Sequence, residues 1–267
     1  MDSRSFVVPT LAIGIAFSIG IGCTSKSCPP CEEATALVEE AKGSDGEPVS
    51  GHHYTLPGLD HGLLQSPVNI LSDETEAGKH HIRFGEANEA EEVANLGTTV
   101  ELSFGRGSTT EFDGKVYELL QLHFHTPAEH LIDGITYPME VHLVHRRPGP
   151  AAFDPPAYLV LALLVRMGAS NAFLAEFLDA IPTQPGEAVE LHDVFLRDVS
   201  RPGVDFDNMH YYHYRGSLTT PPYTESVDWL IAKEIVEAGP AQIQRINLLE
   251  GDNARHVQAL YSREIDE

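Results

Sequence analysis

Basic side chains are scarce in this chain of 267 residues: 17 lysines and arginines stand against 40 acidic residues, which gives a formal net charge of −23. Because such a surface repels nucleic-acid phosphates, the imbalance excludes nucleic-acid binding. The three cysteines all lie before residue 32, so no disulfide can form within the rest of the chain. No internal repeat is present, and the length beyond residue 50 fits one domain with a substantial core.

The N-terminal segment has the composition of a targeting sequence. Residues 6–22 are apolar and uncharged and follow Arg4, but they fall short of the about 20 residues that a spanning helix needs. This pattern favours a secretory signal peptide over residues 1–22. Its end resembles a bacterial lipobox, in which Cys23 would be acylated; an uncleaved membrane anchor is the alternative. Both predict a protein of the bacterial cell envelope, periplasmic or extracellular, whose only membrane contact is this N-terminal tether.

An acidic, flexible tether is expected over residues 23–50. Its Cys28-Pro-Pro-Cys31 segment has redox-type spacing, but no strand precedes it within a folded unit. A local disulfide or incidental cysteines are therefore favoured over redox catalysis. Residues 51–267 are predicted to form the functional domain.

Histidines gather in two short segments that are predicted to be β-strands, residues 121–130 and 139–145. Alternate side chains of an extended strand share a face, so His123 and His125 point the same way. Turn-forming residues between the segments predict that the second strand returns antiparallel to the first. His142 would then meet the other two imidazoles at one point.

Three imidazoles that converge in this way leave a fourth tetrahedral position free, which is typical of a catalytic zinc site. Gln121 lies two residues before His123 and shares its face. Glu140 stands in the same relation to His142. Metal-bound imidazoles usually donate their second N–H to such an oxygen, so this pairing favours a metal site over isolated structural histidines. The predicted ligands of Zn²⁺ are His123, His125 and His142.

Other histidines are predicted to have other roles. His145 lies on the opposite face of its strand from His142, which favours a core or inter-strand hydrogen bond. His130 lacks ligand-like spacing. The polar, turn-rich stretches around them predict solvated side chains for His52, His53, His80 and His81.

Further motifs accompany the two histidine strands in a fixed order. They are Gln65–Ile70, Tyr214–Pro222 followed by Trp229, and Asp252–Gln258. With the histidine strands they resemble the α-class carbonic anhydrases, specifically the shorter bacterial members, over roughly residues 52 to 267. The resemblance implies a mainly β (α+β) fold, with a large, twisted, mostly antiparallel sheet and short peripheral helices. It also implies reversible hydration of carbon dioxide to bicarbonate and a proton by zinc-bound hydroxide.

The resemblance assigns roles to residues around the metal. Gln121, Glu140 and the backbone carbonyl of Asn253 are implied to accept hydrogen bonds from the ligands His123, His142 and His125, respectively. Thr219 is implied to accept a hydrogen bond from the zinc-bound hydroxide. An ionised Glu129 would take the proton of that threonine, so that the hydroxide keeps a lone pair facing the substrate.

An apolar wall beside the metal would suit carbon dioxide, which makes few directional contacts. Val144 shares the ligand face of its strand. The resemblance implies that the wall is completed by Val160, Leu218, Val227 and Trp229, and that Thr220 contacts the product. Ordinary core packing is the alternative reading of the apolar residues.

The chain departs from the family pattern at the usual proton-shuttle histidine, where Thr98 stands. A threonine hydroxyl does not titrate near neutral pH, whereas an imidazole does. Proton export is therefore expected to be slow unless His52, His53 or His61 takes over.

Two other functions are weighed against the enzyme. A catalytically silent relative could serve as a surface-tethered binding module, but such relatives typically lose a metal ligand and this chain keeps all three. Ester hydrolysis would use the same chemistry, and no dedicated acyl pocket is predicted, so it is expected as a side reaction at most.

Overall fold

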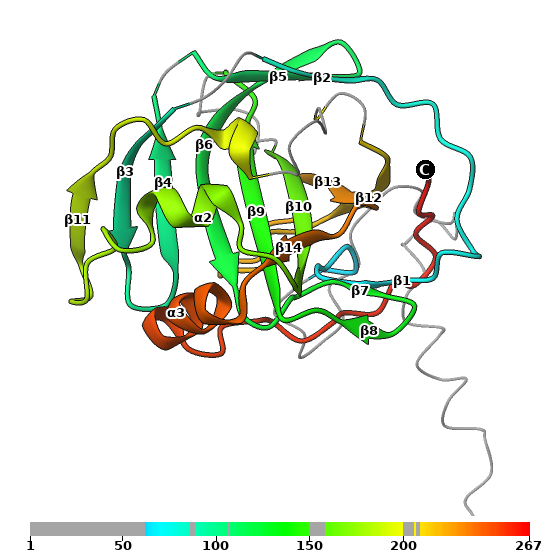
Figure 1. Ribbon diagram of the computed structural model, residues 1–267. Coiled ribbons are helices and arrows are strands. Elements are labelled where there is room, and N and C mark those ends of the chain that lie inside the picture. The colour runs from blue at the N-terminus through cyan, green and yellow to red at the C-terminus, as the bar shows by residue number, and fades with distance from the viewer. Residues whose placement is uncertain (1–61, 86–88, 106, 150–157, 200–205, 207–208) are drawn as a thin grey trace, which may run out of the picture. The chain divides into compact units, whose positions relative to one another are not determined.

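The computed structural model describes residues 62–85, 89–105, 107–149, 158–199, 206 and 209–267. Within them the chain forms an 11-stranded sheet, a separate 3-stranded sheet and two α-helices (Figure 1). The expected large, mostly antiparallel sheet with short peripheral helices is confirmed. The predicted signal peptide, lipobox and tether lie outside the described residues. None of the described helices is long and apolar enough to cross a membrane.

The large sheet follows the strand order β11-β3-β4-β6-β9-β10-β13-β12, with β5 pairing β2 and β6, and β14 pairing β10. The strands of this sheet are β2 (Ile82–Phe84), β3 (Ala90–Asn95), β4 (Val100–Phe104), β5 (Thr109–Phe112), β6 (Lys115–His125), β9 (Met139–Arg146), β10 (Tyr158–Met167), β11 (Glu187–Glu190), β12 (Tyr211–Gly216), β13 (Val227–Ala232) and β14 (Val236–Ala238). The small sheet contains β1 (Asn69–Ile70), β7 (Leu131–Ile132) and β8 (Ile135–Thr136). The helices are α2 (Ala172–Phe177), α3 (Pro240–Glu250) and the short 3₁₀ helix η1 (Leu196–Asp198).

Strands β9 and β10 lie at the centre of the sheet and are buried on both faces. Seven successive residues of β9, from Met139 to His145, are buried, as are seven of β10, from Leu159 to Val165. Their near-continuous apolar sequences fit this position, because a strand covered on both sides cannot alternate apolar with polar residues. Strand β10 is also where the sheet becomes mixed, since it pairs in parallel with β13 and β14.

Two hydrophobic clusters cover the two faces of the sheet. One contains Phe173 and Phe177 of α2 and Ile243 of α3, packed with side chains such as Leu143 of β9. The other contains Val144, the next residue of β9, together with side chains of β10 and β13. Among the described residues, both α-helices pack on the first face, and the polar side chains of the histidine strands lie on the second.

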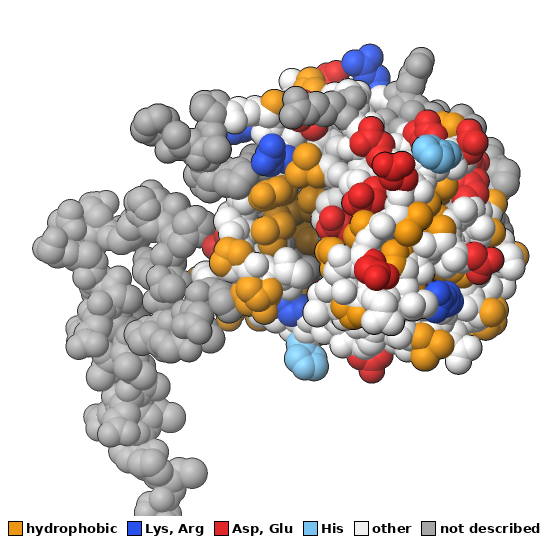
Figure 2. All heavy atoms as spheres, turned by 90° about the vertical axis from the view of Figure 1, so that its left-hand side faces the viewer, with side chains coloured by type: hydrophobic (Ala, Val, Ile, Leu, Met, Phe, Trp, Pro, Cys, Tyr) orange, Lys and Arg blue, Asp and Glu red, His pale blue; other side chains and the backbone are white. Residues whose placement is uncertain are grey.

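The edge strand β11 is charged rather than covered. All four of its residues are exposed, and Glu187 and Glu190 are among them. Figure 2 views the molecule from this side and shows acidic side chains gathered on it. Charge on an edge strand opposes pairing with the strands of other chains, so part of the acidic excess blocks edge-to-edge association.

Helix α3 is joined to the end of β6, which carries two of the predicted ligands. The carboxyl group of Glu250, the last residue of α3, accepts hydrogen bonds from the Thr126 hydroxyl at 3.0 Å and from the Val100 N–H at 3.3 Å. Asn247 of the same helix donates to the Thr126 hydroxyl at 3.2 Å. Burial raises the pKa of Glu250 to about 8. The helix therefore fixes the residue that directly follows His125 through a buried carboxyl group whose raised pKa favours the protonated form.

Replacement of Glu250 by Gln should change how stability depends on pH. Between the ordinary value of 4.5 and about 8, the carboxyl group is ionised in the unfolded chain but protonated in the folded one. The wild type should therefore lose stability relative to Glu250→Gln as the pH rises from about 5 to about 8, by on the order of 2 kcal/mol. Denaturant unfolding of both proteins at the two pH values measures this difference, and parallel pH profiles would contradict it.

Candidate metal centre

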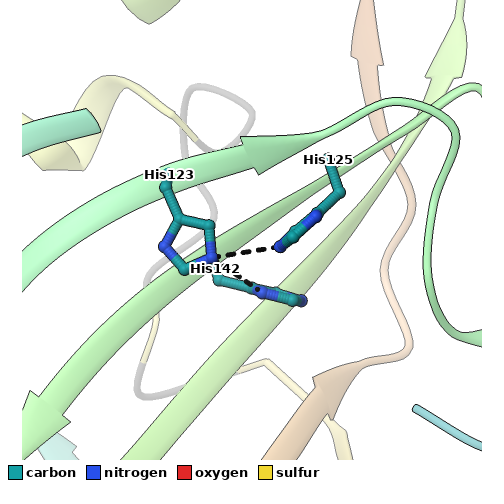
Figure 3. A group of neighbouring side chains, drawn as sticks. All are labelled: His123, His125 and His142. Carbon is teal, nitrogen blue, oxygen red and sulfur yellow. Dashed lines mark hydrogen bonds between the residues drawn. The ribbon is translucent and has the colours of Figure 1, made fainter. Parts of the chain in front are cut away.

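The register of strands β6 and β9 brings three imidazole rings together. His123 of β6 lies directly opposite His142 of β9, and His125 lies opposite Glu140. All three rings point toward one another from the same face of the sheet (Figure 3). The Nε2 atom of His123 lies 3.1 Å from Nε2 of His125 and 3.3 Å from Nδ1 of His142.

These spacings match the ligands of a small tetrahedral ion. With Zn–N bonds of about 2.0–2.1 Å, the nitrogens of a tetrahedral site lie roughly 3.3 Å apart. The three candidate ligand atoms lie within 4.8 Å of one another. His125 and His142 are buried, whereas His123 is partly exposed, so the cluster reaches solvent on one side.

Hydrogen bonds on the outer side of the rings fix which nitrogen keeps a lone pair. His123 donates its Nδ1–H to Oε1 of Gln121 at 2.8 Å, and His142 donates its Nε2–H to Oε1 of Glu140 at 2.7 Å. The inner nitrogens of His123 and His142 therefore both carry lone pairs and face each other. Because two acceptors cannot bond to each other, a cation is what this donor set fits.

Electrostatics keep the three rings neutral. Burial lowers the pKa of His123 well below 6.5, and the neighbouring rings of His125 and His142 lower it further. Burial and then His142 lower the pKa of His125 to about 3, and burial also lowers the pKa of His142. Neutral imidazole is the form that binds a metal ion, so these rings are held ready for one at neutral pH.

A buried hydrogen-bond chain extends behind His142. Oε1 of Glu140 also contacts Nδ1 of His130 at 2.6 Å, and Nε2 of His130 lies 2.6 Å from the Tyr214 hydroxyl, which donates to the Ser66 hydroxyl at 2.9 Å. Burial alone would raise the pKa of Glu140, but its contacts with His130 and His142 hold that pKa well below the ordinary range. His130 therefore supports an ionised Glu140, a role that the spacing of the histidines did not reveal.

Asn253 lies where it supports the strand that carries His125. Its side chain donates to the Phe124 carbonyl at 3.1 Å and accepts from the Thr126 N–H at 3.0 Å, which are the residues on either side of His125. The Nδ1 atom of His125 is buried without a hydrogen-bond partner among the described residues, although contacts with Asn253 favour the protonated ring. Oε1 of Glu129 lies 3.5 Å from the same nitrogen.

Glu129 and Thr219 lie together beside the cluster. Oε1 of Glu129 accepts the backbone N–H of Arg255 at 2.8 Å. Burial and then Glu140 raise the pKa of Glu129 to about 8, although the Arg255 N–H and contact with the Thr219 hydroxyl act in the opposite direction. The protein environment by itself thus favours a protonated Glu129, whereas the sequence-based role requires an ionised one. A cation at the histidines would shift this balance toward the carboxylate.

The loop that carries Thr219 is fixed by an indole group. Trp229 of β13 donates its Nε1–H to the Ser217 carbonyl at 3.0 Å, and the Leu218 N–H donates to the Thr224 carbonyl at 3.0 Å. Thr219 itself is 8% exposed. The neighbouring Thr220 is exposed. The tight loop therefore holds the Thr219 side chain inward beside Glu129.

The apolar residues predicted to form a wall lie beside the histidines. Val144, Val160 and Trp229 are cross-strand neighbours on β9, β10 and β13. The centroids of the Trp229 and His142 rings are 4.9 Å apart. Val227 belongs to the same hydrophobic cluster, and Leu218 packs against it. The predicted wall is thus continuous with the core of this face of the sheet.

Three other residues that the sequence singled out, His145, Thr98 and His80, lie outside the cluster of His123, His125 and His142. His145 is buried and its Nε2 lies 3.0 Å from the Thr110 hydroxyl, as expected for an inter-strand residue. Thr98 is exposed in the turn between β3 and β4, and its carbonyl accepts from Asn253. His80 is not simply solvated, because both of its ring nitrogens contact aspartates. Three histidines proposed as alternative shuttles lie outside the described residues: His52, His53 and His61.

Residues of the distant sequence motifs converge behind the site. Arg255 donates from Nη1 to the Gln65 side chain at 2.9 Å and to the Ser66 carbonyl at 2.7 Å. The Ser66 hydroxyl also accepts the Ser217 N–H at 3.1 Å. The sequence motifs singled out these residues but gave no function for them. In the structure they connect the Thr219 loop and Glu129 to the Gln65–Ile70 segment.

Comparison with known proteins agrees with this geometry. The family model for eukaryotic-type carbonic anhydrase matches residues 53–267. A carbonic anhydrase of Neisseria gonorrhoeae is 36% identical over 209 residues, covering 77% of this chain and 78% of that protein. One from Pectobacterium atrosepticum is 31% identical over 203 residues, covering 76% and 79%.

A solved structure supports the same assignment. The α-carbonic anhydrase of Photobacterium profundum superposes with a TM-score of 0.66 at 33% identity, over 77% of this chain and 89% of that one. The family model covers the histidine cluster, the Thr219 loop and Arg255 alike. On these grounds the chain belongs to the eukaryotic-type, or α-class, carbonic anhydrase family and is an enzyme of that family.

Proposed function

We propose that the protein catalyses the reversible hydration of carbon dioxide with a Zn²⁺ ion held by His123, His125 and His142. The main support is that His123 and His142 each direct a nitrogen lone pair at the other. Nε2 of His123 and Nδ1 of His142 lie 3.3 Å apart, and the second nitrogen of each ring is bonded to an oxygen. The bound ion would supply Lewis-acid activation of water, so that a nucleophile exists at neutral pH.

The outer hydrogen bonds tune the ligands for this task. Gln121 gives His123 a neutral acceptor, whereas Glu140 gives His142 a charged one. All three ligands themselves are neutral imidazoles, so the positive charge of a bound divalent ion remains available to the fourth position. The buried contacts of Glu140 with His130 keep that carboxylate ionised and its orientation fixed.

Thr219 and Glu129 are proposed to orient the attack. The Thr219 hydroxyl would accept a hydrogen bond from the attacking hydroxide, which leaves a lone pair of the nucleophile free for the substrate. This requires Glu129 to accept the Thr219 proton, and positive charge at the histidine cluster favours the ionised Glu129 that can do so. The fixed Ser217 carbonyl and the Arg255 N–H hold the two side chains in this arrangement.

The substrate is proposed to lie against the apolar cluster beside the metal position. Val144, Val160 and Trp229 are buried apolar side chains beside the histidines, and the Trp229 N–H is already bonded to the Ser217 carbonyl, which suits an apolar, linear molecule. Leu218, Val227 and Thr220 are proposed to border the same space, with Thr220 contacting the product.

Proton export is proposed to limit the maximal rate in weak buffer. By resemblance Thr98 stands at the shuttle position of the family, and it is exposed. Its hydroxyl cannot exchange a proton with solvent near neutral pH in the way an imidazole does. A histidine from residues 52–61 is the alternative relay.

The sequence also supports a proposal for where the enzyme is located. Residues 1–22 are proposed as a signal peptide, Cys23 as the lipidated residue, residues 23–50 as an acidic tether, and residues 51–267 as the catalytic domain. The enzyme would then be tethered at the bacterial cell envelope, periplasmic or extracellular. An unlipidated, uncleaved anchor would give the same topology, and mass spectrometry of the mature N-terminus separates the two.

Removal of the metal should abolish activity. Stopped-flow measurement of CO₂ hydration before and after treatment with a zinc chelator should show loss of essentially all catalysis. Zn²⁺ should restore it, whereas Mg²⁺ should not, because Mg²⁺ prefers oxygen ligands. A chelated protein that hydrates CO₂ at the original rate would contradict the proposal, and a protein without metal-dependent activity would favour a silent binding module.

Replacement of Thr219 by Ala should slow CO₂ hydration by on the order of a hundredfold, because the nucleophile would lose its orientation. The variant should retain zinc, since Thr219 is not a ligand. Thr219→Ser keeps the hydroxyl and is the matched control, expected to retain most of the rate. Equal kcat/KM for the Ala and Ser variants would remove this hydroxyl from the mechanism.

Buffer concentration should control the maximal rate if Thr98 leaves the enzyme without a shuttle. Added imidazole-type buffer should raise kcat severalfold while kcat/KM stays nearly constant, because proton export follows the CO₂ step. In weak buffer Thr98→His should raise kcat as well. Insensitivity of the wild-type kcat to buffer would show that another group relays the proton or that another step limits the rate.

A further inference from the structure

A second group of potential metal ligands lies on the opposite face of the sheet. It consists of His80, which precedes β2, His213 in β12, and Asp266 near the C-terminal end of the chain. β12 and the C-terminal end lie close together in Figure 1. Tyr214 points toward the candidate metal centre, so strand alternation directs the adjacent His213 to the other side.

The spacing of these atoms resembles that of a bound ion's ligands. Oδ1 of Asp266 lies 3.2 Å from Nε2 of His80 and 3.3 Å from Nδ1 of His213. The two imidazole rings have centroids 4.2 Å apart. Ligands of a tetrahedral zinc ion are roughly 3.3 Å from one another, so one ion could contact all three groups with small side-chain movements.

Each histidine also has a carboxylate on its far side. Nδ1 of His80 lies 2.6 Å from Oδ2 of Asp113, and Nε2 of His213 lies 3.5 Å from Oδ1 of Asp228. Such carboxylates accept the outer N–H of metal-bound imidazoles and raise their basicity. The inner nitrogens, Nε2 of His80 and Nδ1 of His213, also lie 3.4 Å from Oδ2 of Asp266, so both face the Asp266 carboxylate.

The Asp266 carboxylate is only partly satisfied by the described residues, because its hydrogen bonds from the two imidazoles are made by Oδ2. Oδ1 of Asp266 is a buried atom with no hydrogen-bond partner among the described residues. Of the basic side chains nearby, Lys233 on the cavity wall is paired with Glu267, and Arg215 is paired with Asp228. The cluster therefore attracts positive charge that its own side chains do not fully supply.

We propose that His80, His213 and Asp266 form a second metal site, separate from the candidate catalytic centre. Its expected ligand is a divalent transition-metal ion, with Zn²⁺ as the first candidate. Two imidazoles and one carboxylate suit Zn²⁺, Cu²⁺ or Ni²⁺ better than Mg²⁺ or Ca²⁺. A surface cavity of about 450 Å³ borders all three residues and gives an ion access from solvent.

A bound ion would cross-link segments far apart in sequence. Asp266 is already joined to His213 through two backbone hydrogen bonds, at 2.7 and 3.0 Å, and the ion would add His80 to this pair. An ion that binds only the folded chain stabilises it in proportion to its concentration relative to Kd. The site is thus inferred to strengthen the attachment of the C-terminal segment without touching the catalytic residues.

Metal stoichiometry of the full chain tests this inference. Isothermal titration of chelator-stripped protein with Zn²⁺ should give two equivalents for the wild type and one for His80→Ala, with Asp266→Asn as a second variant. His81→Ala is the matched control, because His81 borders the same cavity but is not in the cluster, and it should keep two equivalents. CO₂ hydration by zinc-saturated His80→Ala should equal that of the wild type.

The outcomes separate this site from the catalytic one. His142→Ala should lose activity and one equivalent while keeping the equivalent that depends on His80. If the wild type binds a single equivalent, or if His80→Ala and Asp266→Asn both keep the second one, the proposed site does not exist. If the second equivalent is present but the protein is inactive with zinc, the surface site stands and the proposed function fails.

Discussion

The rings of His123 and His142 direct nitrogen lone pairs at each other on one face of the sheet, and the surrounding hydrogen bonds hold the rings in this orientation. The inner nitrogens of His123 and His142 are 3.3 Å apart, and each ring has its other nitrogen committed to an oxygen acceptor. Because burial opposes protonation of these rings, the repulsion between the lone pairs is not relieved by a proton. Occupation of the cluster by a cation is the arrangement that satisfies both rings, which is why we interpret the cluster as a zinc site.

The register of the strands brings the histidine rings together. Direct pairing of His123 with His142 follows from the antiparallel alignment of β6 and β9, whose neighbours bury both faces. The same register sets Val144 beside Val160 and Trp229, so the apolar side chains and the candidate metal ligands share one face. The loops beside the sheet are fixed by helix α3, the Trp229 indole and Arg255. The acidic edge at β11 and the proposed surface metal site lie elsewhere and leave this arrangement undisturbed.

Much of this could be predicted from sequence because a strand has a period of two. That period put His123 and His125 on one face, separated His145 from His142, and paired each of two ligands with an acceptor. The family resemblance predicted the large sheet and the proximity of Glu129 to Thr219. What sequence could not reveal depends on contacts between distant segments. The link of His130 to Tyr214, the raised pKa of Glu129 and the pairing of His80 with Asp266 arise only after folding.

Zinc K-edge X-ray absorption on the His80→Ala protein loaded with one equivalent of Zn²⁺ would identify the ligands of the buried histidine cluster. Because the surface cluster is disabled in this variant, the spectrum should report only the buried site. We expect three imidazole nitrogens and one solvent oxygen, at about 2.0–2.1 Å, with the multiple scattering of histidine rings. Sulfur at about 2.3 Å, which Cys28 and Cys31 could supply, or fewer than three imidazoles would contradict it.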